Sequence, residues 1–350
     1  MKRIAKTAFV SIMLIACIAF VYNYDKKDIQ NEVSSIQPEE IFTMQIGHGH
    51  GVGSIRHRVL RVFKSMVEER TDGGVIVNIF PSGQLGTELD MHKEVEEGTL
   101  QGVWGGGFDI VPKLSIFTLP FLADDETEMY RLLESDFMMD ICKESQSKGI
   151  EVLGIGCGGG FRQLSNNVRP IKSPDDMKGL RIRVNDIETI RDTMEAFGAE
   201  LVNIPYNDIY QSLKQGIADG QENPWSNIVS MRFYEVQKYF TKIDYQFHPN
   251  PFYVNSKWLN SLPPEYEKII RECAKTMISL ERQYEEKEKE NDLKQIMAYS
   301  EIYELTEEER NEFKKASEIV YEKYLDEGIV TKEELEIIER IKKGEAESDL

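Results

Sequence analysis

Cysteine is scarce in this sequence, with 4 residues of this type among 350. Cys142, Cys157 and Cys273 are widely separated and lack a metal-binding spacing, so we expect buried free thiols, although a disulfide stays possible. Basic charge is also in deficit, because 42 lysines and arginines stand against 61 acidic residues, a net charge of -19. This deficit excludes nucleic acid as a partner and argues against broad contact with anionic lipid, since few basic groups remain to neutralise phosphates.

The amino terminus differs from the rest of the chain. An uncharged run, residues 7–23, follows a short basic segment and is typical of an export signal. Residues 14–17 have the form of a lipoprotein cleavage site in which Cys17 carries the lipid; an uncleaved signal anchor is the alternative, because apolar residues follow that cysteine. In both cases residues 1–22 are the signal or anchor segment, residues 23–40 are a polar tether, and the body lies outside the cytoplasmic membrane.

Strand-like and helix-like patterns alternate along the body. Residues 42–46 and 75–80 are predicted strands that flank a helix at 54–70, and the alternation repeats after Gly149. Alternation of this kind is typical of an α/β fold with a largely parallel sheet, and the chain exceeds the size at which a single core usually divides. A long helix from Pro264 is expected to span two lobes and brace them. We therefore predict a two-lobed clamshell of class α/β.

A pair of arginines on a short predicted strand indicates an anion-binding function. Arg181 and Arg183 are two positions apart, so in a regular strand both point to one face, and only a bulge or twist decides which enters a cleft. The arginine fork matches a carboxylate because it donates two parallel, charge-assisted hydrogen bonds. Downstream, residues 217–225 join a turn-forming Asp-Gly to an amide, an acid and an Asn-Pro corner, directly before an expected helix start. Together these segments predict a protein that grips a small organic anion.

Several motifs in a fixed order carry a family resemblance. They are Pro-Ser-Gly-Gln-Leu-Gly at 81–86, Leu-Pro-Phe at 119–121, Asp-Met-Lys-Gly-Leu-Arg-Ile-Arg-Val at 176–184, Asp-Gly-Gln-Glu-Asn-Pro at 219–224 and Phe-Tyr-Glu-Val-Gln-Lys at 233–238. From about residue 42 to residue 298 the chain resembles the substrate-binding proteins of TRAP (tripartite ATP-independent periplasmic) transporters. The resemblance implies a periplasmic-binding-protein fold, type II-like, with lobe 1 at 41–158 plus about 249–288 and lobe 2 at 159–248 plus about 289–345.

The resemblance also implies roles for particular side chains. Arg183 matches the arginine that salt-bridges the substrate carboxylate, and Asn223 matches the asparagine that hydrogen-bonds the same group. The other implied positions are a second arginine, a polar position beside the first arginine, an aromatic pocket floor and a first-strand loop: Arg162, Asp186, Tyr206, and His48 with His50. Trp225 is a candidate apolar wall. Where the family often has a polar or acidic ligand this chain has glycine at 105–107, a departure that leaves more room or fewer hydroxyl contacts for the substrate.

Each of these positions has a competing interpretation. Arg162 could form a salt bridge between lobes, and Trp225 could be ordinary core packing. The two histidines could be structural or, with a poor zinc spacing, metal ligands; we favour hydrogen bonds to ligand hydroxyls and expect no metal. Glu222 has no partner acid, base or nucleophile at a recognisable spacing, so we expect a structural role for it and no enzyme activity.

The resulting hypothesis is an extracytoplasmic protein that binds a small organic acid and delivers it to the integral-membrane subunits of a TRAP transporter. It needs no cofactor, and it contacts the membrane only through its amino terminus. A sugar acid such as a uronate or an aldonate is favoured by the histidines, Asp186 and several aromatics. A C4-dicarboxylate is the alternative and would use Arg162 for its second carboxylate. An enzyme on the same clamshell, or a surface interaction protein, is a more distant alternative.

Overall fold

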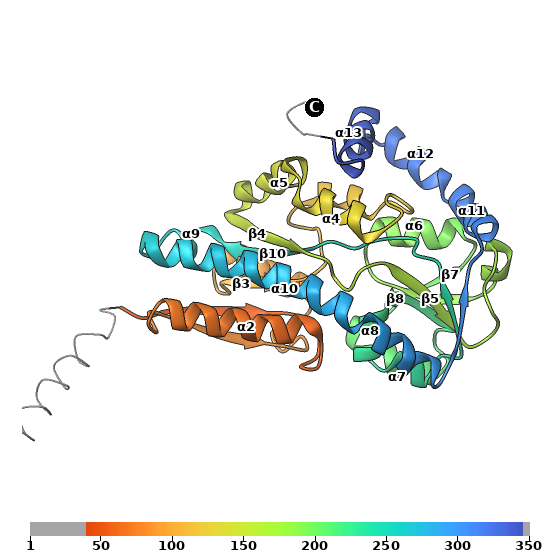
Figure 1. Ribbon diagram of the computed structural model, residues 1–350, viewed down its shortest axis with the longest axis horizontal. Coiled ribbons are helices and arrows are strands. Elements are labelled where there is room, and N and C mark those ends of the chain that lie inside the picture. The colour runs from red at the N-terminus through yellow and green to blue at the C-terminus, as the bar shows by residue number, and fades with distance from the viewer. Residues whose placement is uncertain (1–39, 346–350) are drawn as a thin grey trace, which may run out of the picture.

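The computed structural model describes residues 40–345 and contains two sheets. The 5-stranded sheet of lobe 1 has the order β2 (Val75–Phe80), β1 (Phe42–Gly47), β3 (Gly102–Trp104), β10 (Asn250–Asn255) and β4 (Ile150–Gly156). The 6-stranded sheet of lobe 2 has the order β11 (Glu301–Glu304), β9 (Tyr239–Lys242), β5 (Arg162–Asn166), β8 (Gly220–Pro224), β6 (Arg181–Val184) and β7 (Glu200–Asn203). Figure 1 shows the two lobes side by side.

Both sheets are mixed, which corrects the expectation of a largely parallel arrangement. In lobe 1, β1 runs parallel to β2 and β3, whereas β10 is antiparallel to β3 and β4. In lobe 2, β6 runs parallel to β7 and β8, whereas β5 is antiparallel to β8 and β9. The two reversed strands, β5 and β10, are the first strands after the crossings between the lobes.

Helix α10 (Pro264–Met297) is the longest element of the described chain and contacts both lobes. Proline in its first turn fits a helix start, since that position has no intrahelical N–H bond to lose. At 34 residues it is about 50 Å long. It packs against α2 (Ile55–Arg70) and β4 in lobe 1, and against α8 (Trp225–Ser230) and β11 in lobe 2, as Figure 1 shows. The predicted bracing helix is therefore confirmed.

Two further connections cross between the lobes, and they touch each other. One joins β4 to β5 and the other joins β9 to β10. Phe161 and Phe247 form an isolated antiparallel bridge between them, with ring centroids 5.4 Å apart and nearly perpendicular planes. An edge-to-face pair of this kind stabilises the junction beyond the area it buries. The side chains beside this bridge therefore lie at the boundary between the lobes.

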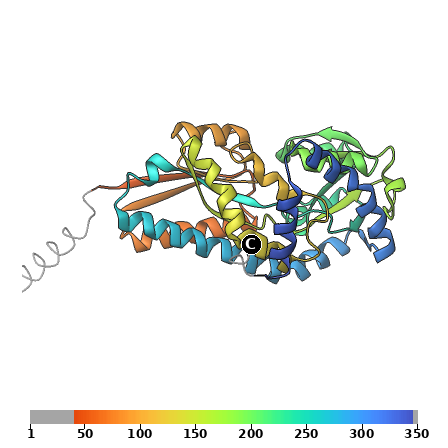
Figure 2. The ribbon, with the colours of Figure 1, turned by 90° about the horizontal axis from the view of Figure 1, so that it is seen from above.

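The carboxyl-terminal helices lie across the lobes. Helix α12 (Glu318–Asp326) contacts α6 (Glu188–Ala196), and α13 (Lys332–Lys342) contacts α4 (Glu126–Glu134). Figure 2 shows these helices in dark blue over the middle of the molecule. The other α-helices of residues 40–345 are α3 (Glu88–Glu97), α5 (Asp136–Cys142), α7 (Ile209–Lys214), α9 (Ser256–Leu259) and α11 (Glu307–Ala316).

The described part of the chain also answers two questions raised by the sequence. Cys142, Cys157 and Cys273 are buried free thiols, as expected. Among residues 40–345, no helix has the length and apolar character needed to cross a membrane. Cys17 and the rest of the predicted signal or anchor lie outside the described residues. The predicted fold class, a two-lobed α/β clamshell, is confirmed.

Candidate functional site

The two arginines of β6 occupy different environments. Arg181, at the start of the strand, donates to both carboxylate oxygens of Asp219, with Nε to Oδ2 at 3.0 Å and Nη2 to Oδ1 at 2.7 Å, and its side chain is 42% exposed. Arg183 is only 3% exposed. Its Nε donates to the backbone oxygen of Ile204 at 2.8 Å, and no acidic side chain of residues 40–345 forms an ion pair with it. Of the pair, Arg183 is the buried one without a counter-ion.

Burial makes the charge of Arg183 costly. It lowers the pKa of Arg183 to about 10; Glu222 opposes the shift and the charge of Arg162 adds to it. Arg183 therefore stays protonated at neutral pH while lacking a carboxylate partner. Buried charges are stable in proteins when they are paired and hydrogen-bonded, so this guanidinium can accept an anion at a net gain in free energy.

Arg162, by contrast, has an internal counter-ion. It lies on β5 beside β8, and its Nη2 donates to Oε1 of Glu222 at 2.8 Å and to the backbone oxygen of the same residue at 2.9 Å, while its Nε contacts Oε2. The hydroxyl of Tyr245 donates to the same carboxylate at 2.7 Å. Burial alone would lower the pKa of Arg162, but Glu222 raises it above its ordinary value. The pair joins neighbouring strands of lobe 2, not the two lobes, and Glu222 has the structural role expected of it.

Asn223 lies beside this pair with a fixed amide orientation. Its Nδ2 donates to Oε1 of Gln221 at 2.5 Å, and its Oδ1 accepts a hydrogen bond from Nη2 of Arg162 at 3.3 Å. Gln221 is held in turn because its Nε2 donates to the Ser165 hydroxyl at 2.8 Å. This chain of hydrogen bonds positions Asn223 before any ligand arrives.

The predicted histidines come from the loop after β1. His48 is fully buried, and its Nε2 lies 3.1 Å from Nδ1 of His57. Burial, with the charges of Arg56 and His57, lowers the pKa of His48 to about 3, so the ring is neutral. His50 stacks on Tyr206, with ring centroids 4.9 Å apart. This stack brings together the segment after β1 and the segment after β7, which belong to different lobes.

Tyr206 is close to all of the buried arginines. Its hydroxyl is buried and makes no well-formed hydrogen bond among residues 40–345, although the Ser230 side chain is near enough to lower its pKa. Burial raises the pKa of Tyr206 to about 12, while the charges of Arg56, Arg183 and Arg162 act in the opposite direction. Since a buried, unpartnered hydroxyl costs free energy, this group can gain by donating to a ligand.

Arg56 is a member of this group that sequence reasoning missed. It lies on α2, and its guanidinium carbon is 5.5 Å from the ring centroid of Trp104. Its Nη2 contacts Oδ1 of Asn250, and its Nη1 donates weakly to the backbone oxygen of Trp104 at 3.5 Å. The sequence signal for this role was its position shortly after the loop that carries His48 and His50.

His248 was also missed, because it lies between strands without any local pattern. It is 5% exposed, and its Nε2 lies 2.8 Å from the backbone oxygen of Gly106. Its ring stacks on Phe108, with centroids 5.1 Å apart. Burial, Arg162 and Arg56 lower the pKa of His248 to about 3.

These side chains form one connected group, which we call the arginine cluster. Its members are Arg56, Arg162, Arg183, Glu222, Asn223, Tyr206, His48, His50 and His248. The arrangement offers guanidinium charge, neutral imidazoles and a free hydroxyl in a buried setting. Groups of these kinds can hydrogen-bond an anion that carries further polar groups.

Two predicted site residues form no hydrogen bond or ring contact with the arginine cluster among residues 40–345, although the charge of Asp186 acts on Arg183. The side chain of Asp186 is 80% exposed, accepts from Nδ2 of Asn203, and lies 3.9 Å from Arg191. Trp225 is buried in a core cluster, with its ring centroid 6.2 Å from that of Phe240. Its surroundings are those of core packing, although one edge reaches a neighbouring pocket.

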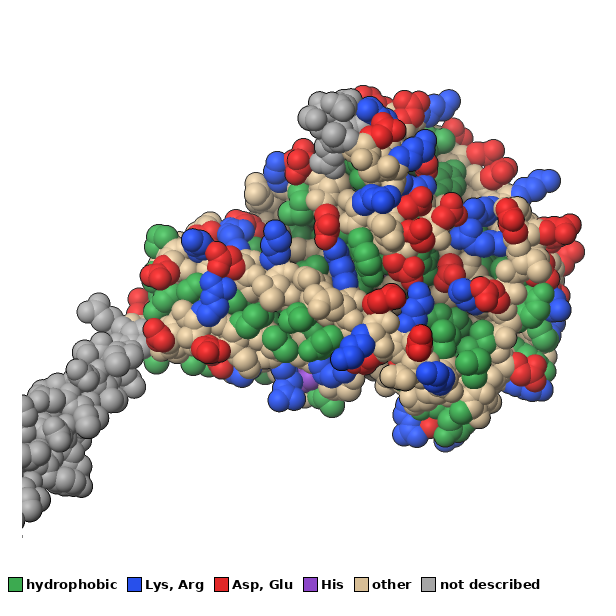
Figure 3. Space-filling view, viewed as in Figure 1, with side chains coloured by type: hydrophobic (Ala, Val, Ile, Leu, Met, Phe, Trp, Pro, Cys, Tyr) green, Lys and Arg blue, Asp and Glu red, His purple; other side chains and the backbone are tan. Residues whose placement is uncertain are grey.

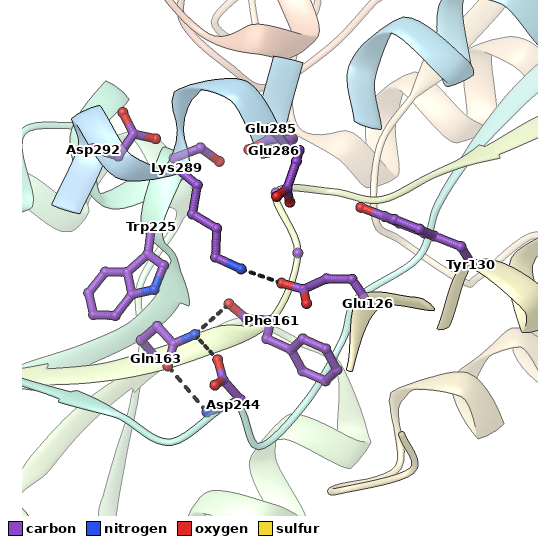
Figure 4. A pocket seen from close by; sticks show the side chains of 13 residues that line it. Glu126, Tyr130, Phe161, Gln163, Trp225, Asp244, Glu285, Glu286, Lys289 and Asp292 are labelled. Atoms are coloured by element: carbon purple, nitrogen blue, oxygen red, sulfur yellow. Dashed lines mark hydrogen bonds and ion pairs between the residues drawn. The ribbon is translucent and has the colours of Figure 1, made fainter. Parts of the chain in front are cut away.

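That pocket lies where β5, α4, α8 and α10 meet. It encloses about 450 Å³, part of it open to solvent. Figure 4 shows Lys289 reaching Glu126, to which it donates at 2.6 Å, with Glu285 and Asp292 nearby on the same helix. A second pocket of about 240 Å³ joins His50 and Arg56 to Glu281 and Glu285. On the face shown in Figure 3, acidic and basic side chains intermingle around this region.

Comparisons with known proteins place the chain in a family. The model of the bacterial extracellular solute-binding protein family 7 matches residues 46–327. The C4-dicarboxylate-binding protein DctB of Bacillus subtilis is 25% identical over 87% of this chain and 85% of its own length. The 2,3-diketo-L-gulonate-binding periplasmic protein YiaO of Escherichia coli is 26% identical over 65% of this chain and 70% of its own.

Solved structures agree with this placement. A TRAP periplasmic solute-binding protein of Shewanella oneidensis with bound succinate has a TM-score of 0.82 and 26% identity, covering 86% of this chain and 99% of the other. A Haemophilus influenzae protein of the same kind with bound L-gulonate has a TM-score of 0.81 and 26% identity over the same shares. The chain belongs to the bacterial extracellular solute-binding protein family 7, the solute-binding proteins of TRAP transporters.

Proposed function

We propose that this protein captures a hydroxylated monocarboxylic acid, a uronate or an aldonate, for TRAP-type transport. Arg183 and Asn223 hold the carboxylate, and the remaining polar groups of the arginine cluster meet the hydroxyls. Closure of the lobes around the anion excludes water, and a buried, charge-assisted pair is stronger than an exposed one. The protein releases the acid unchanged.

The observation that carries the proposal is the unequal compensation of the buried arginines. Arg162 already has Glu222 as its counter-ion, so a second substrate carboxylate would compete with a carboxylate that is part of the protein. Arg183 has no acidic partner among residues 40–345. The charge of Arg56 acts on Glu281 and Glu285 behind it. Within lobe 2, one buried guanidinium of residues 40–345 thus lacks a counter-ion, which favours a single carboxylate there.

A C4-dicarboxylate remains the second candidate. It is favoured by the Bacillus subtilis relative, which is named for that substrate class, and by the succinate bound to the Shewanella oneidensis structure. In this chain the second carboxylate would have Arg56 as its nearest free cation, because Nε of that arginine has no partner among the described residues. The L-gulonate and β-D-galacturonate complexes of other similar proteins favour the sugar acid.

Ligand identification tests the proposal directly. Protein purified from its expression host is denatured, and the released small molecules are identified by mass spectrometry. Protein freed of ligand is then screened by thermal shift against hexuronates, aldonates, succinate and malate. We expect a rise in melting temperature with one or more sugar acids and none with the dicarboxylates. A rise only with succinate or malate would favour the second candidate, and no rise with any acid would refute both.

The partners and the location extend the proposal. Proteins of this family are extracytoplasmic, and we propose that the amino terminus holds this one at the membrane, where the integral subunits of the transporter receive its ligand. Cys17 is the proposed lipid attachment site. Labelling of growing cells with a fatty-acid analogue tests this: we expect label in the wild-type protein and none in Cys17→Ser, whereas membrane-bound wild-type protein without label would assign the anchoring to an uncleaved signal instead.

A further inference from the structure

His248 holds an unusual position between the lobes. It lies on the connection from β9 to β10, next to the Phe161–Phe247 bridge, and its ring is fixed by stacking on Phe108. The Gly105–Gly107 run makes room for it, because a Cβ at Gly106 would collide with the imidazole. Of the residues in the arginine cluster, His248 is therefore among the most rigidly placed.

The hydrogen bond to Gly106 fixes the tautomer of this ring. A backbone carbonyl only accepts, so Nε2 of His248, 2.8 Å away, must carry the hydrogen. The ring is neutral, since its pKa is lowered to about 3 by burial and by the charges of Arg162 and Arg56. In a neutral imidazole protonated at Nε2, Nδ1 holds a lone pair and can only accept. The same argument fails for His48, because its partner His57 can donate or accept.

The acceptor at Nδ1 is buried and unused. It is inaccessible to water and has no hydrogen-bond partner among residues 40–345. Asn250, two residues along, connects it to the cluster, because its Nδ2 donates to the backbone oxygen of His248 at 2.7 Å and its Oδ1 receives Arg56. A buried acceptor without a donor costs free energy, which a suitable ligand group would recover.

The surroundings decide which ligand group is suitable. A carboxylate carries no hydrogen, so its oxygens and the lone pair of Nδ1 would repel each other. An ammonium group could donate, but Arg56 and Arg162 place positive charge around the ring. A hydroxyl donates without charge and satisfies both conditions.

We propose that His248 selects for a hydroxyl: its Nδ1 accepts a hydrogen bond from a hydroxyl of the bound acid and disfavours a second carboxylate at that place. This inference deepens the proposed function and rests on it. It makes the discrimination between a sugar acid and a dicarboxylate a property of one nitrogen atom. A site built to hydrogen-bond a hydroxyl rejects analogues that lack it, since its polar group is then left unpaired.

Paired variants separate this role from a structural one. His248→Gln can still donate to Gly106 from its terminal amide but lacks the acceptor at the Nδ1 position, whereas His248→Asn keeps a polar group near that position and loses the Gly106 bond. Binding of L-gulonate, D-galacturonate, succinate and a series of gulonates that each lack one hydroxyl is measured by calorimetry. For the wild-type protein we expect one deoxy analogue to bind at least about 10-fold more weakly than L-gulonate.

The variants should change that discrimination. In His248→Gln, L-gulonate should bind about 10-fold more weakly, and the sensitive deoxy analogue should bind nearly as well as L-gulonate; His248→Asn should recover part of the loss. Nitrogen-15 NMR of histidine-labelled protein should show the His248 Nδ1 resonance moving when L-gulonate is added, and a purely structural histidine would not produce that shift.

The possible failures are distinguishable. Wild-type protein that binds L-gulonate with equal tolerance for loss of every hydroxyl, or His248→Gln with unchanged affinity, overturns the role of His248 while leaving the proposed function intact. Tighter binding of succinate than of either sugar acid also overturns it and supports the second candidate. Wild-type protein that binds none of these acids overturns the proposed function together with this inference. If His248→Gln does not fold, the deoxy series on the wild-type protein still decides.

Discussion

The two lobes bring different chemistry to the boundary between them. Lobe 2 contributes charge: Arg162 with its counter-ion Glu222, and Arg183 with none among the described residues. Lobe 1 contributes the neutral imidazole His48 and an arginine, Arg56, held by an aromatic face and an amide. The comparison suggests a division of work in which lobe 2 recognises the carboxylate of an acid and lobe 1 recognises the remainder of the same molecule.

The same comparison can be made within a single strand. Arg181 and Arg183 share a face of β6, yet one is neutralised at the surface by Asp219 and the other is buried without an acid. Exposed ion pairs contribute about 0–1 kcal/mol, whereas an uncompensated buried charge costs several times more. Arg183, the less stable of the two arginines in the unliganded protein, is thus the one at which binding of an anion lowers the free energy most.

Removal of the Arg183 guanidinium should have the largest effect. Arg183→Ala should weaken L-gulonate binding by about 3–5 kcal/mol, the general cost of breaking a buried pair. Calorimetry measures the affinity, and Arg181→Ala is the matched control, because it loses only exposed or half-exposed bonds, to Asp219 and to the backbone oxygens of Gly216 and Ile217. The control should bind normally and lose little stability. Equal losses in both variants would contradict the assignment of the carboxylate to Arg183.

Removal of the Glu222 carboxylate should leave Arg162 buried without a counter-ion, as Arg183 already is among the described residues. Glu222→Gln leaves Arg162 buried and unpaired, so we expect the free energy of unfolding to fall by about 3 kcal/mol, measured by urea denaturation. The variant then has a second uncompensated cation in lobe 2, and its relative affinity for succinate should rise. Asp175→Asn, which breaks the exposed pair with Lys178, should change stability by less than about 0.5 kcal/mol. If the preference between succinate and L-gulonate does not change, the number of uncompensated cations in lobe 2 does not determine which acid the protein selects.

Glu285 lies on α10 and lines both pockets, and its contribution to stability should depend on pH. Burial and the nearby Glu281 raise the pKa of Glu285 from 4.5 to about 8, with Asp292 adding and Ser226 and Arg56 opposing. A raised carboxyl pKa means that the folded state binds the proton more tightly, so this contribution to stability is present below pH 4.5 and is lost as the pH rises through 8.

The measurement is a pair of denaturation curves at two pH values. Glu285→Gln should match the wild-type protein at about pH 5 and exceed its stability by about 1–2 kcal/mol at about pH 9. Its neighbour Glu286 is exposed, so Glu286→Gln should show no such divergence. If the stability of the wild-type protein and that of Glu285→Gln change equally between the two pH values, the pKa of Glu285 is not raised in the folded protein.

Much of the fold was predictable, and the site was predictable in part. Alternating strand and helix patterns identified the two lobes, and helical spacing after Pro264 identified the brace. The strand that carries Arg183 was predicted, but its burial relative to Arg181 depends on Asp219, which lies on another part of the chain. Mixed sheets could not be predicted, because strand direction depends on where the chain returns from the other lobe.

The residues missed by the sequence share a physical reason. Arg56 and His248 take their roles from contacts with residues far along the chain, such as Asn250 and Gly106, and no spacing encodes such contacts. Asp186 shows the converse: it follows β6 closely, but it lies at the surface because the strand ends at Val184 and the chain turns outward. Nearness in sequence to a buried residue does not ensure burial.

The smallest expected effect concerns the contact between lobes at Tyr206. Tyr206→Phe keeps the ring that stacks on His50 and removes only the hydroxyl, which makes no well-formed hydrogen bond among residues 40–345. Stability without ligand should change little, because no hydrogen bond is lost, whereas L-gulonate affinity should fall by about 0.5–1.5 kcal/mol if the hydroxyl donates to the acid. Tyr210→Phe is the control, since it loses an exposed bond to Glu235 and should bind normally. A Tyr206→Phe protein with full affinity would limit Tyr206 to stacking, and the recognition of hydroxyls would then fall to the imidazoles alone.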